Sequence, residues 1–126
     1  MQMREIISSR KAPSSTSPVS QATRGGGMIF VGGQMPRDIA SGEIVLGALE
    51  QARISLAHCI CILEEAGSGA EKVLRADVFL TDLTAKDAVN KVFEEVFGDH
   101  PPARNLVEVS EIGENAIVEI ALIALS

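Results

Sequence analysis

Two amphipathic segments separated by an apolar strand constrain the fold of this chain more than any other feature of its sequence. Between residues 47 and 66 apolar side chains recur every three or four positions, and Gly67 supplies a natural helix stop. A second apolar stripe begins at Thr84, whose side chain could cap a helix, and ends at Gly98. Residues 73–80 lie between the two segments and alternate with the period of a strand. Because a helix with one apolar face must bury it against another layer, this pattern predicts an α+β fold.

Other short segments have the composition of strands. They are residues 3–8, 28–31, 43–45, 104–109 and 116–125. The predicted order is strand-strand-strand-helix-strand-helix-strand-strand, so the expected architecture is one mixed sheet of about six strands with two helices packed on one face. No repeat divides the 126 residues, and residues 1–126 are therefore predicted to form a single domain.

The charge of the chain argues against nucleic acid as its main partner. The chain has 11 Lys and Arg against 17 Asp and Glu, which gives a net charge of −6. Binding to phosphates requires a basic surface, and no local cluster of Lys and Arg could form one. With four Phe, no Trp and no Tyr, side chains that could stack on bases are also scarce.

The cysteines and the N-terminal residues favour a cytoplasmic protein. Cys59 and Cys61 have a spacing that fits neither a redox motif nor a zinc site, so two free, buried thiols in a reducing compartment are expected. Residues 1–10 lack the apolar segment of a secretory signal. No apolar stretch is long enough to span a bilayer, so no membrane partner is expected.

The common catalytic and metal-binding motifs do not occur in the sequence. Gly25-Gly26-Gly27 is typical of a turn, because the Lys and the Ser or Thr of a phosphate-binding loop do not follow it. His58 and His100 lie far apart in the sequence; His58 is expected to be structural, and His100 could line a cleft. The sequence therefore predicts no metal and no cofactor, and the residues alone identify no catalytic group.

Arg104 is the strongest candidate for binding a ligand. It follows Pro101-Pro102, which restrict the backbone just where a strand is predicted to begin. From such a well-held position, its planar guanidinium could bind a carboxylate through two parallel hydrogen bonds. A solvated Arg at the edge of a sheet is the alternative that the residues leave open.

Several short strings occur in the order typical of one family. The most specific are F-V-G-G-Q-M-P at residues 30–36 and P-P-A-R at residues 101–104, followed by V-E-V, and others lie at residues 11–13, 17–22, 42–45, 78–82 and 118–120. This series resembles the RidA/YjgF family, whose members are also labelled endoribonuclease L-PSP or translation initiation inhibitor. The resemblance covers nearly the whole chain. It implies a chorismate-mutase-like α+β fold and a homotrimer with ligand clefts between neighbouring subunits.

The same resemblance implies an activity and two substrate-binding residues. Members of the family hydrolyse reactive enamines and imines, such as 2-iminobutanoate, to a 2-keto acid and ammonia without a cofactor or a metal. Arg104 matches the arginine that binds the substrate carboxylate, and Gly33 matches a glycine that offers its backbone to the ligand.

The chain departs from the family pattern at four positions that are expected to line the cleft. Val19 stands where active members usually have Tyr, Gly32 where they have Ser, and Leu106 where Cys or Thr is common. The resemblance assigns the usual water-activating Glu to the position of Ala121. The expected cleft therefore keeps its anion-binding residue and loses polar groups around it.

Three functions stay open at this point. The chain is an imine or enamine deaminase, weak or with an altered substrate, or a non-catalytic trimer that binds a small carboxylate metabolite through Arg104. A ribonuclease or translation inhibitor is disfavoured by the charge. The first two differ over whether a base reaches the cleft. Glu119 lies two residues from Ala121, about 6.8 Å along a strand, and is interpreted, with Glu108, as part of the common scaffold.

Overall fold

The computed structural model describes residues 3–126. Met1 and Gln2, the first two residues of the predicted domain, lie outside this range. The strands are β1 (Glu5–Ile7), β2 (Ala22–Gly25), β3 (Met28–Gln34), β4 (Val73–Leu80), β5 (Ala103–Glu108) and β6 (Val118–Leu125). The helices are α1 (Ala48–Glu65) and α2 (Lys86–Phe97), with short 3-10 turns η1 (Ala70–Lys72), η2 (Leu83–Ala85) and η3 (Gly113–Asn115).

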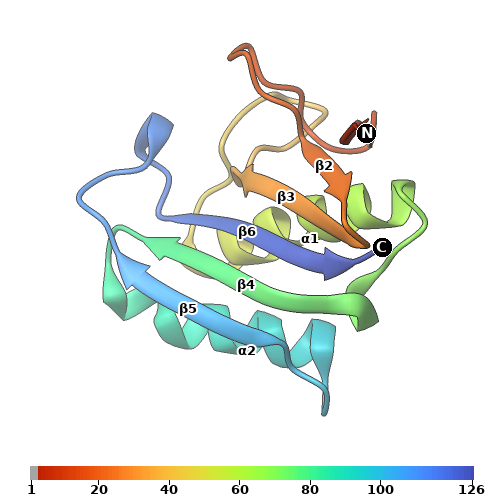
Figure 1. Ribbon diagram of the computed structural model, residues 1–126. Coiled ribbons are helices and arrows are strands. Elements are labelled where there is room, and N and C mark those ends of the chain that lie inside the picture. The colour runs from red at the N-terminus through yellow and green to blue at the C-terminus, as the bar shows by residue number, and fades with distance from the viewer. Residues whose placement is uncertain (1–2) are drawn as a thin grey trace.

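The six strands form one mixed sheet in the order β1-β2-β3-β6-β4-β5, in which β4 and β5 run parallel and the other neighbours run antiparallel. Both helices pack on the same face of this sheet (Figure 1). The predicted α+β architecture, with one mixed sheet and two helices on one face, is confirmed.

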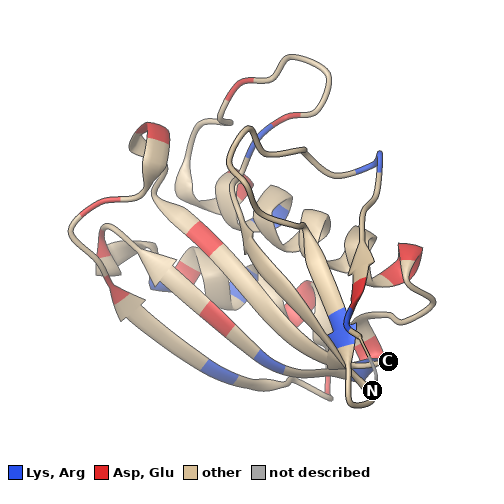
Figure 2. Ribbon diagram, turned by 45° about the horizontal axis from the view of Figure 1, so that its top comes forward, with Lys and Arg blue, Asp and Glu red and all other residues tan. Residues whose placement is uncertain are grey.

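The hydrophobic core lies between the sheet and the two helices. The central strand β6 shows this directly, because its even-numbered residues from Val118 to Ala124 are buried, whereas its odd-numbered residues from Glu119 to Ile123 are half-buried. The first set faces the helices and the second faces the opposite side of the sheet. Along the strands, helices and loops, the 11 Lys and Arg are scattered among the 17 Asp and Glu (Figure 2).

One strand prediction is wrong and one strand was not predicted, so the predicted number of strands is unchanged. Residues 43–45 form no strand, and Ile44 makes only an isolated bridge to Arg37. In contrast, Ala22–Gly25 forms β2, which was not predicted because its composition is partly polar. It is a strand because β1 pairs with one of its edges and β3 with the other, and tertiary pairing of this kind overrides local propensity.

The predicted cap of the second helix is also corrected. Asp82, rather than Thr84, is the capping acceptor: its carboxylate accepts hydrogen bonds from the backbone N of Thr84 at 2.9 Å and from its Oγ1 at 2.7 Å. These bonds lower the pKa of Asp82. They close η2, and α2 begins only at Lys86. A carboxylate is a stronger acceptor than a hydroxyl, so Thr84 serves as the donor.

The cysteines and His58 have structural surroundings. Cys59 is fully buried and its Sγ donates to the backbone O of Ile120 at 3.3 Å, and burial raises the pKa of its thiol. Cys61 is free as well but half-buried rather than buried. The Nε2 atom of His58 lies 2.6 Å from the backbone O of Arg37, as expected for a structural residue.

Within residues 3–126, no three His, Cys, Asp or Glu side chains are grouped closely enough to hold a metal ion. Over the same residues, neither helix combines the length and the apolarity that crossing a membrane requires.

Candidate functional site

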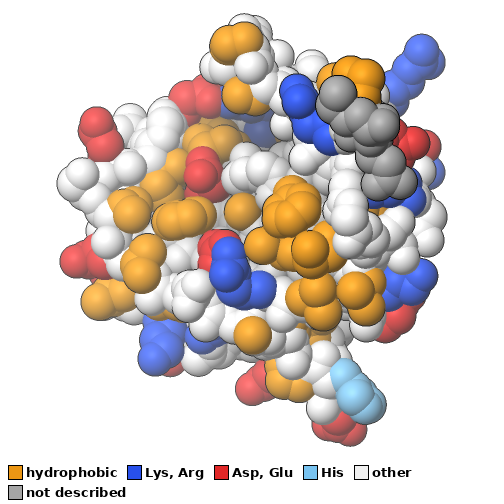
Figure 3. All heavy atoms as spheres, in the orientation of Figure 1, with side chains coloured by type: hydrophobic (Ala, Val, Ile, Leu, Met, Phe, Trp, Pro, Cys, Tyr) orange, Lys and Arg blue, Asp and Glu red, His pale blue; other side chains and the backbone are white. Residues whose placement is uncertain are grey.

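The face of the sheet opposite the helices is uncovered and rich in apolar side chains. Phe30, Val107 and Leu125 are each between 43% and 48% exposed on it, although large apolar residues are usually buried. Figure 3 shows hydrophobic side chains spread over much of this face, with acidic and basic side chains among them. An apolar surface of this kind is typical of an interaction site.

Glu119 lies on this open face, against Gly33. A Cβ atom placed on Gly33 would meet Oε2 of Glu119 at 2.6 Å and its Cδ at 2.9 Å. The carboxylate therefore occupies the space that a side chain at position 33 would fill. The two residues meet because β3 pairs with β6 and its register shifts between Val31 and Gln34, which locally bends the strand.

The carboxylate of Glu119 is poorly solvated and lacks a compensating charge. It is half-buried, and burial raises its pKa above the usual 4.5. None of the ion pairs formed by residues 3–126 involves it. An unpaired carboxylate with a raised pKa can accept a proton near neutral pH more readily than an exposed one, which is the property of a general base.

The loop that carries Val19 lies beside the same glycines. The backbone N of Gly32 donates to the backbone O of Gln21 at 2.9 Å. Gln21 in turn holds the loop: its Oε1 accepts from the backbone N of Ser9 at 2.6 Å, and its Nε2 donates to the backbone O of Pro13 at 2.9 Å. Val19 itself lies in this loop, three residues before β2, and is 67% exposed.

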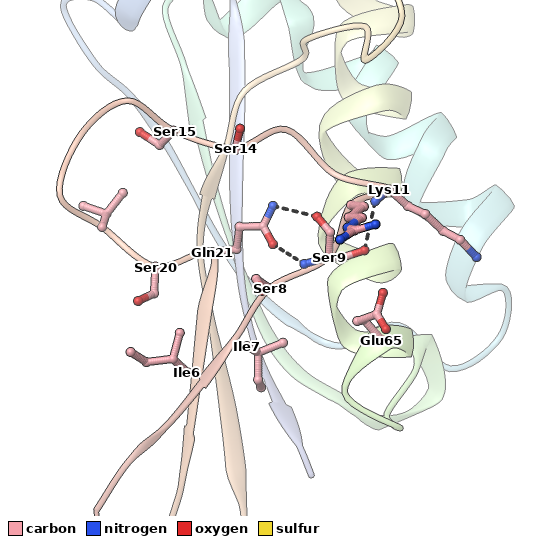
Figure 4. A pocket seen from close by; sticks show the side chains of 12 residues that line it. Ile6, Ile7, Ser8, Ser9, Lys11, Ser14, Ser15, Ser20, Gln21 and Glu65 are labelled. Carbon is pink, nitrogen blue, oxygen red and sulfur yellow. Dashed lines mark hydrogen bonds between the residues drawn. The ribbon is translucent and has the colours of Figure 1, made fainter.

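A hollow of about 920 Å³ lies between this loop, β1 and the end of α1 (Figure 4). Gln21 and Ser9 join across it, as the dashed lines in Figure 4 show, and serine side chains line much of its wall. Val19, which was predicted to line the cleft, lines this hollow, whereas Gly33 and Arg104 do not. The hollow therefore shares one residue with the predicted cleft and lacks both residues expected to bind the substrate.

Arg104 lies on the other face of the sheet, at its edge. It pairs with the buried Ala76 of β4, so its side chain points toward the helices. Its Cζ atom lies 5.0 Å from the centroid of the Phe93 ring on α2. The guanidinium is half-buried, which lowers its pKa, and among residues 3–126 no carboxylate forms an ion pair with it.

A single chain does not bring all the predicted site residues together. The open face collects Gly32, Gly33 and Ala121, and Ala121 pairs with Asp77 on that side. Leu106 pairs with the buried Val78 and so shares the helix side with Arg104. The strand β4 separates β5 from β6, and neighbouring strands are about 4.8 Å apart. The two halves of the predicted cleft are therefore at different places on one chain.

Glu119 was assigned to the common scaffold from the sequence, because it occupies a motif position shared with active members of the family and lies two residues from Ala121. The structure adds its contact with Gly33. The contact with Gly33 runs across two strands and leaves no periodic signal in the sequence. The only available signal was the presence of a charged residue within an otherwise apolar strand.

The family model described as "Endoribonuclease L-PSP" matches residues 9–126. The chain belongs to this family, the RidA/YjgF family. A RutC family protein of Pyrococcus abyssi is 41% identical over 122 residues, 96% of each chain. TdcF of Escherichia coli, named as a candidate reactive intermediate deaminase, is 32% identical over 126 residues, 98% of each chain.

Solved structures of the family confirm the fold. The crystal structure of Escherichia coli TdcF with bound serine aligns with a TM-score of 0.92 at 32% identity and covers 97% of this chain and 98% of that chain. The crystal structure of the Escherichia coli YjgF gene product aligns with a TM-score of 0.91 at 33% identity and covers 96% and 98%. The RidA/YjgF fold predicted from the sequence is therefore correct.

The contact between Gly33 and Glu119 leads to a first prediction. In a Gly33→Ala variant the new methyl group should displace the carboxylate, because the end of a flexible side chain gives way more easily than the backbone. Glu119 should move into solvent, and its pKa should fall back toward 4.5. A pH titration of the Glu119 carboxyl carbon by NMR measures this shift.

Gly32→Ala is the matched control, since its Cβ would approach only the backbone O of Gln21 at 3.5 Å and that of Ser20 at 3.7 Å. A raised pKa that persists in Gly33→Ala would contradict the assigned contact.

Proposed function

We propose that this protein hydrolyses reactive 2-imino acids to 2-keto acids and ammonia, with Glu119 as the general base. The observation that carries the proposal is the half-buried Glu119 carboxylate against Gly33, which forms no ion pair within residues 3–126. Membership of a family in which TdcF is named as a candidate reactive intermediate deaminase supports the same reaction.

The reaction needs an anion-binding group and one proton carrier. Arg104 binds the substrate carboxylate through its guanidinium, and the backbone of Gly33 contacts the ligand beside it. Glu119 removes a proton from water while the water oxygen forms a bond to the imine carbon, and it passes this proton to the imine nitrogen, which gives the carbinolamine. Glu119 then takes the proton of the carbinolamine hydroxyl and delivers it to the nitrogen as the C–N bond breaks, so that ammonia leaves and the C=O bond of the keto acid forms. No redox step occurs, and protons and electrons balance within the enzyme, water and substrate.

The missing Glu at position 121 need not abolish this reaction. Ala121 lies on the same face as Glu119, two residues further along β6. A carboxylate is already present beside Gly33, so the reaction can proceed with Ala121 in its place. Relatives usually carry Tyr at the position of Val19, Ser at that of Gly32, and Cys or Thr at that of Leu106. The cleft of this chain is less polar, and this favours a substrate with an apolar side chain.

A homotrimer would complete the cleft. Gly33 and Glu119 belong to the open face, whereas Arg104 extends from the edge strand β5. The cleft would form where Arg104 of one subunit reaches the Gly33 and Glu119 of the next. The apolar open face would supply the contact area between the subunits.

The oligomeric state provides a second prediction. Light scattering at micromolar concentration should give three times the monomer mass of 13.3 kDa. Phe30→Asp should shift the protein toward monomer, because it places a charge on the open face where Phe30 is 43% exposed. Leu83→Asp, at a 50% exposed position in η2, should leave the trimer intact. A monomeric wild-type protein would exclude a cleft shared between subunits.

A non-catalytic carboxylate-binding role is the second candidate. It is favoured by one observation on a relative, the TdcF structure with bound serine, because serine carries a carboxylate. In that role Arg104 would bind a metabolite that is never hydrolysed. Keto-acid formation from freshly generated 2-iminobutanoate separates the two candidates, because only the deaminase releases product.

Ribonuclease activity, which the description of the family model suggests, is not proposed. Phosphoryl chemistry on RNA would need a pair of acid–base groups or a metal. The two histidines do not form such a pair, because His58 is buried with its Nε2 atom against the backbone O of Arg37, whereas His100 is exposed in a loop. The net charge of −6 would repel the substrate.

The deaminase would act in the cytoplasm, the compartment expected from the sequence.

A further inference from the structure

The side chain of Arg104 contacts a different kind of partner from four other arginines of the chain. Arg24, Arg37, Arg53 and Arg75 each form an ion pair with a nearby carboxylate. Arg104 instead lies over an aromatic ring, with its Cζ atom 5.0 Å from the centroid of Phe93. A half-buried cation without an acidic neighbour is costly unless another group stabilises it.

The ring under Arg104 is itself held in place. Phe93 is 7% exposed, and its ring centroid lies 5.3 Å from that of Phe97 at an interplanar angle of 55°. The two residues are one turn apart on α2, the spacing at which helical side chains contact each other. Phe97 is buried as well, so the ring under the guanidinium packs against a second buried ring.

An aromatic partner leaves the hydrogen-bonding capacity of an arginine free. A carboxylate partner would accept the N–H bonds of the guanidinium and neutralise its charge. A ring attracts the cation through its π electrons and accepts no conventional hydrogen bond. Arg104 can therefore be held in a defined position before a ligand arrives and still offer its N–H donors to a carboxylate.

We propose that Phe93 is the positioning residue for Arg104 in carboxylate binding. Its ring holds the guanidinium at the edge of β5, so that less side-chain freedom is lost when the substrate carboxylate binds. This role rests on the proposed function, because it requires Arg104 to be the carboxylate-binding group. Phe93 itself does not contact the reacting atoms and is not a catalytic residue.

A series of fluorinated phenylalanines at position 93 separates this role from simple packing. Fluorine withdraws π electrons and weakens the attraction to a cation, while the ring keeps nearly the same shape. Calorimetry with 2-oxobutanoate should show affinity that falls stepwise with fluorination, to about five- to tenfold weaker for pentafluorophenylalanine. kcat/KM for 2-iminobutanoate should fall by a similar factor and kcat by less, because the effect is on binding. Phe93→Tyr, which retains an electron-rich ring, should bind nearly as the wild type does.

Two further measurements identify the cause. The same fluorinated residues at Phe97 are the matched control, because that ring lies on the same helix but not under the guanidinium, and they should change affinity little. The NMR signal of the Arg104 Nε–H group should show a ring-current shift in the free protein that is lost in Phe93→Leu. This second readout reports the contact without any ligand.

The outcomes that would overturn the role are distinct. Wild-type affinity throughout the Phe93 series, in a protein that binds 2-oxobutanoate, would mean that the ring only packs and would leave the proposed function intact. Equal losses in the Phe93 and Phe97 series would assign the effect to a general weakening of α2. A wild-type protein that shows the ring-current shift but binds no carboxylate would overturn the role and the proposed function together.

Discussion

Glu119→Gln should slow the hydrolysis of 2-iminobutanoate by about 10²- to 10⁴-fold, the usual contribution of general acid–base catalysis. The amide keeps the shape of the side chain against Gly33 but can no longer take a proton from water. The measurement is the rate of keto-acid formation from imine generated in the same vessel. Glu108→Gln is the matched control, because Glu108 is an exposed carboxylate on the edge strand β5 and should be replaceable with little effect.

The pH dependence of the wild-type rate follows from the same carboxylate. Glu119 must be ionised to act as a base, and burial raises its pKa above 4.5. The rate should therefore be low in acid and should rise as the pH passes upward through this raised value. The sign for stability is opposite: the folded protein binds this proton more tightly than the unfolded chain, so the contribution of Glu119 to stability decreases as the pH rises through the same window.

A substitution at Ala121 tests whether position 121 or position 119 carries the base. If position 121 must carry the base, the wild-type rate should already be very low, Glu119→Gln should change it little, and Ala121→Glu should raise it. If Glu119 is the base, Ala121→Glu should give no comparable gain. A folded Glu119→Gln protein with the wild-type rate would therefore refute the role assigned to Glu119.

Arg104→Ala should weaken the binding of a small carboxylate by roughly ten- to a hundredfold. A hydrogen bond to a charged group contributes about 1.5–3 kcal/mol. Among residues 3–126, no carboxylate forms an ion pair with Arg104 and competes for its donors. Calorimetric titration with 2-oxobutanoate gives the affinity directly. Arg104→Lys should recover only part of it, because an ammonium group cannot form two parallel hydrogen bonds to one carboxylate.

Arg53→Ala is the control for Arg104→Ala. Arg53 lies on α1 and is paired with Glu95 at 3.1 Å, which raises its pKa, so its guanidinium already binds a carboxylate of the chain. Its removal should leave the affinity for 2-oxobutanoate unchanged. If Arg104→Ala and Arg53→Ala bind the acid equally well, Arg104 is an ordinary surface residue and the carboxylate is bound elsewhere.

Local spacing in the sequence was sufficient to predict most of the elements. The helix predicted over residues 47–66 and the end of the second helix at Gly98 agree with α1 and α2, because apolar side chains repeat at the helical period there. The alternation within residues 73–80 likewise identified β4. Local spacing failed at β2, because a short and partly polar segment becomes a strand only when strands pair with both of its edges.

The family could also be inferred from the sequence, because its short motifs occur in the expected order along the chain. The same motifs identified Gly33 and Arg104 as candidate substrate-binding residues. Only the tertiary structure decided what surrounds these two residues. Glu119 lies against Gly33 because β3 pairs with β6 across a shifted register, and no property of either segment alone specifies that pairing. Arg104 lies over Phe93 because β5 joins the sheet beside β4 and α2 packs behind it. Residue type and spacing are local properties, whereas burial, pKa and the choice of partner depend on which distant segments the fold brings together.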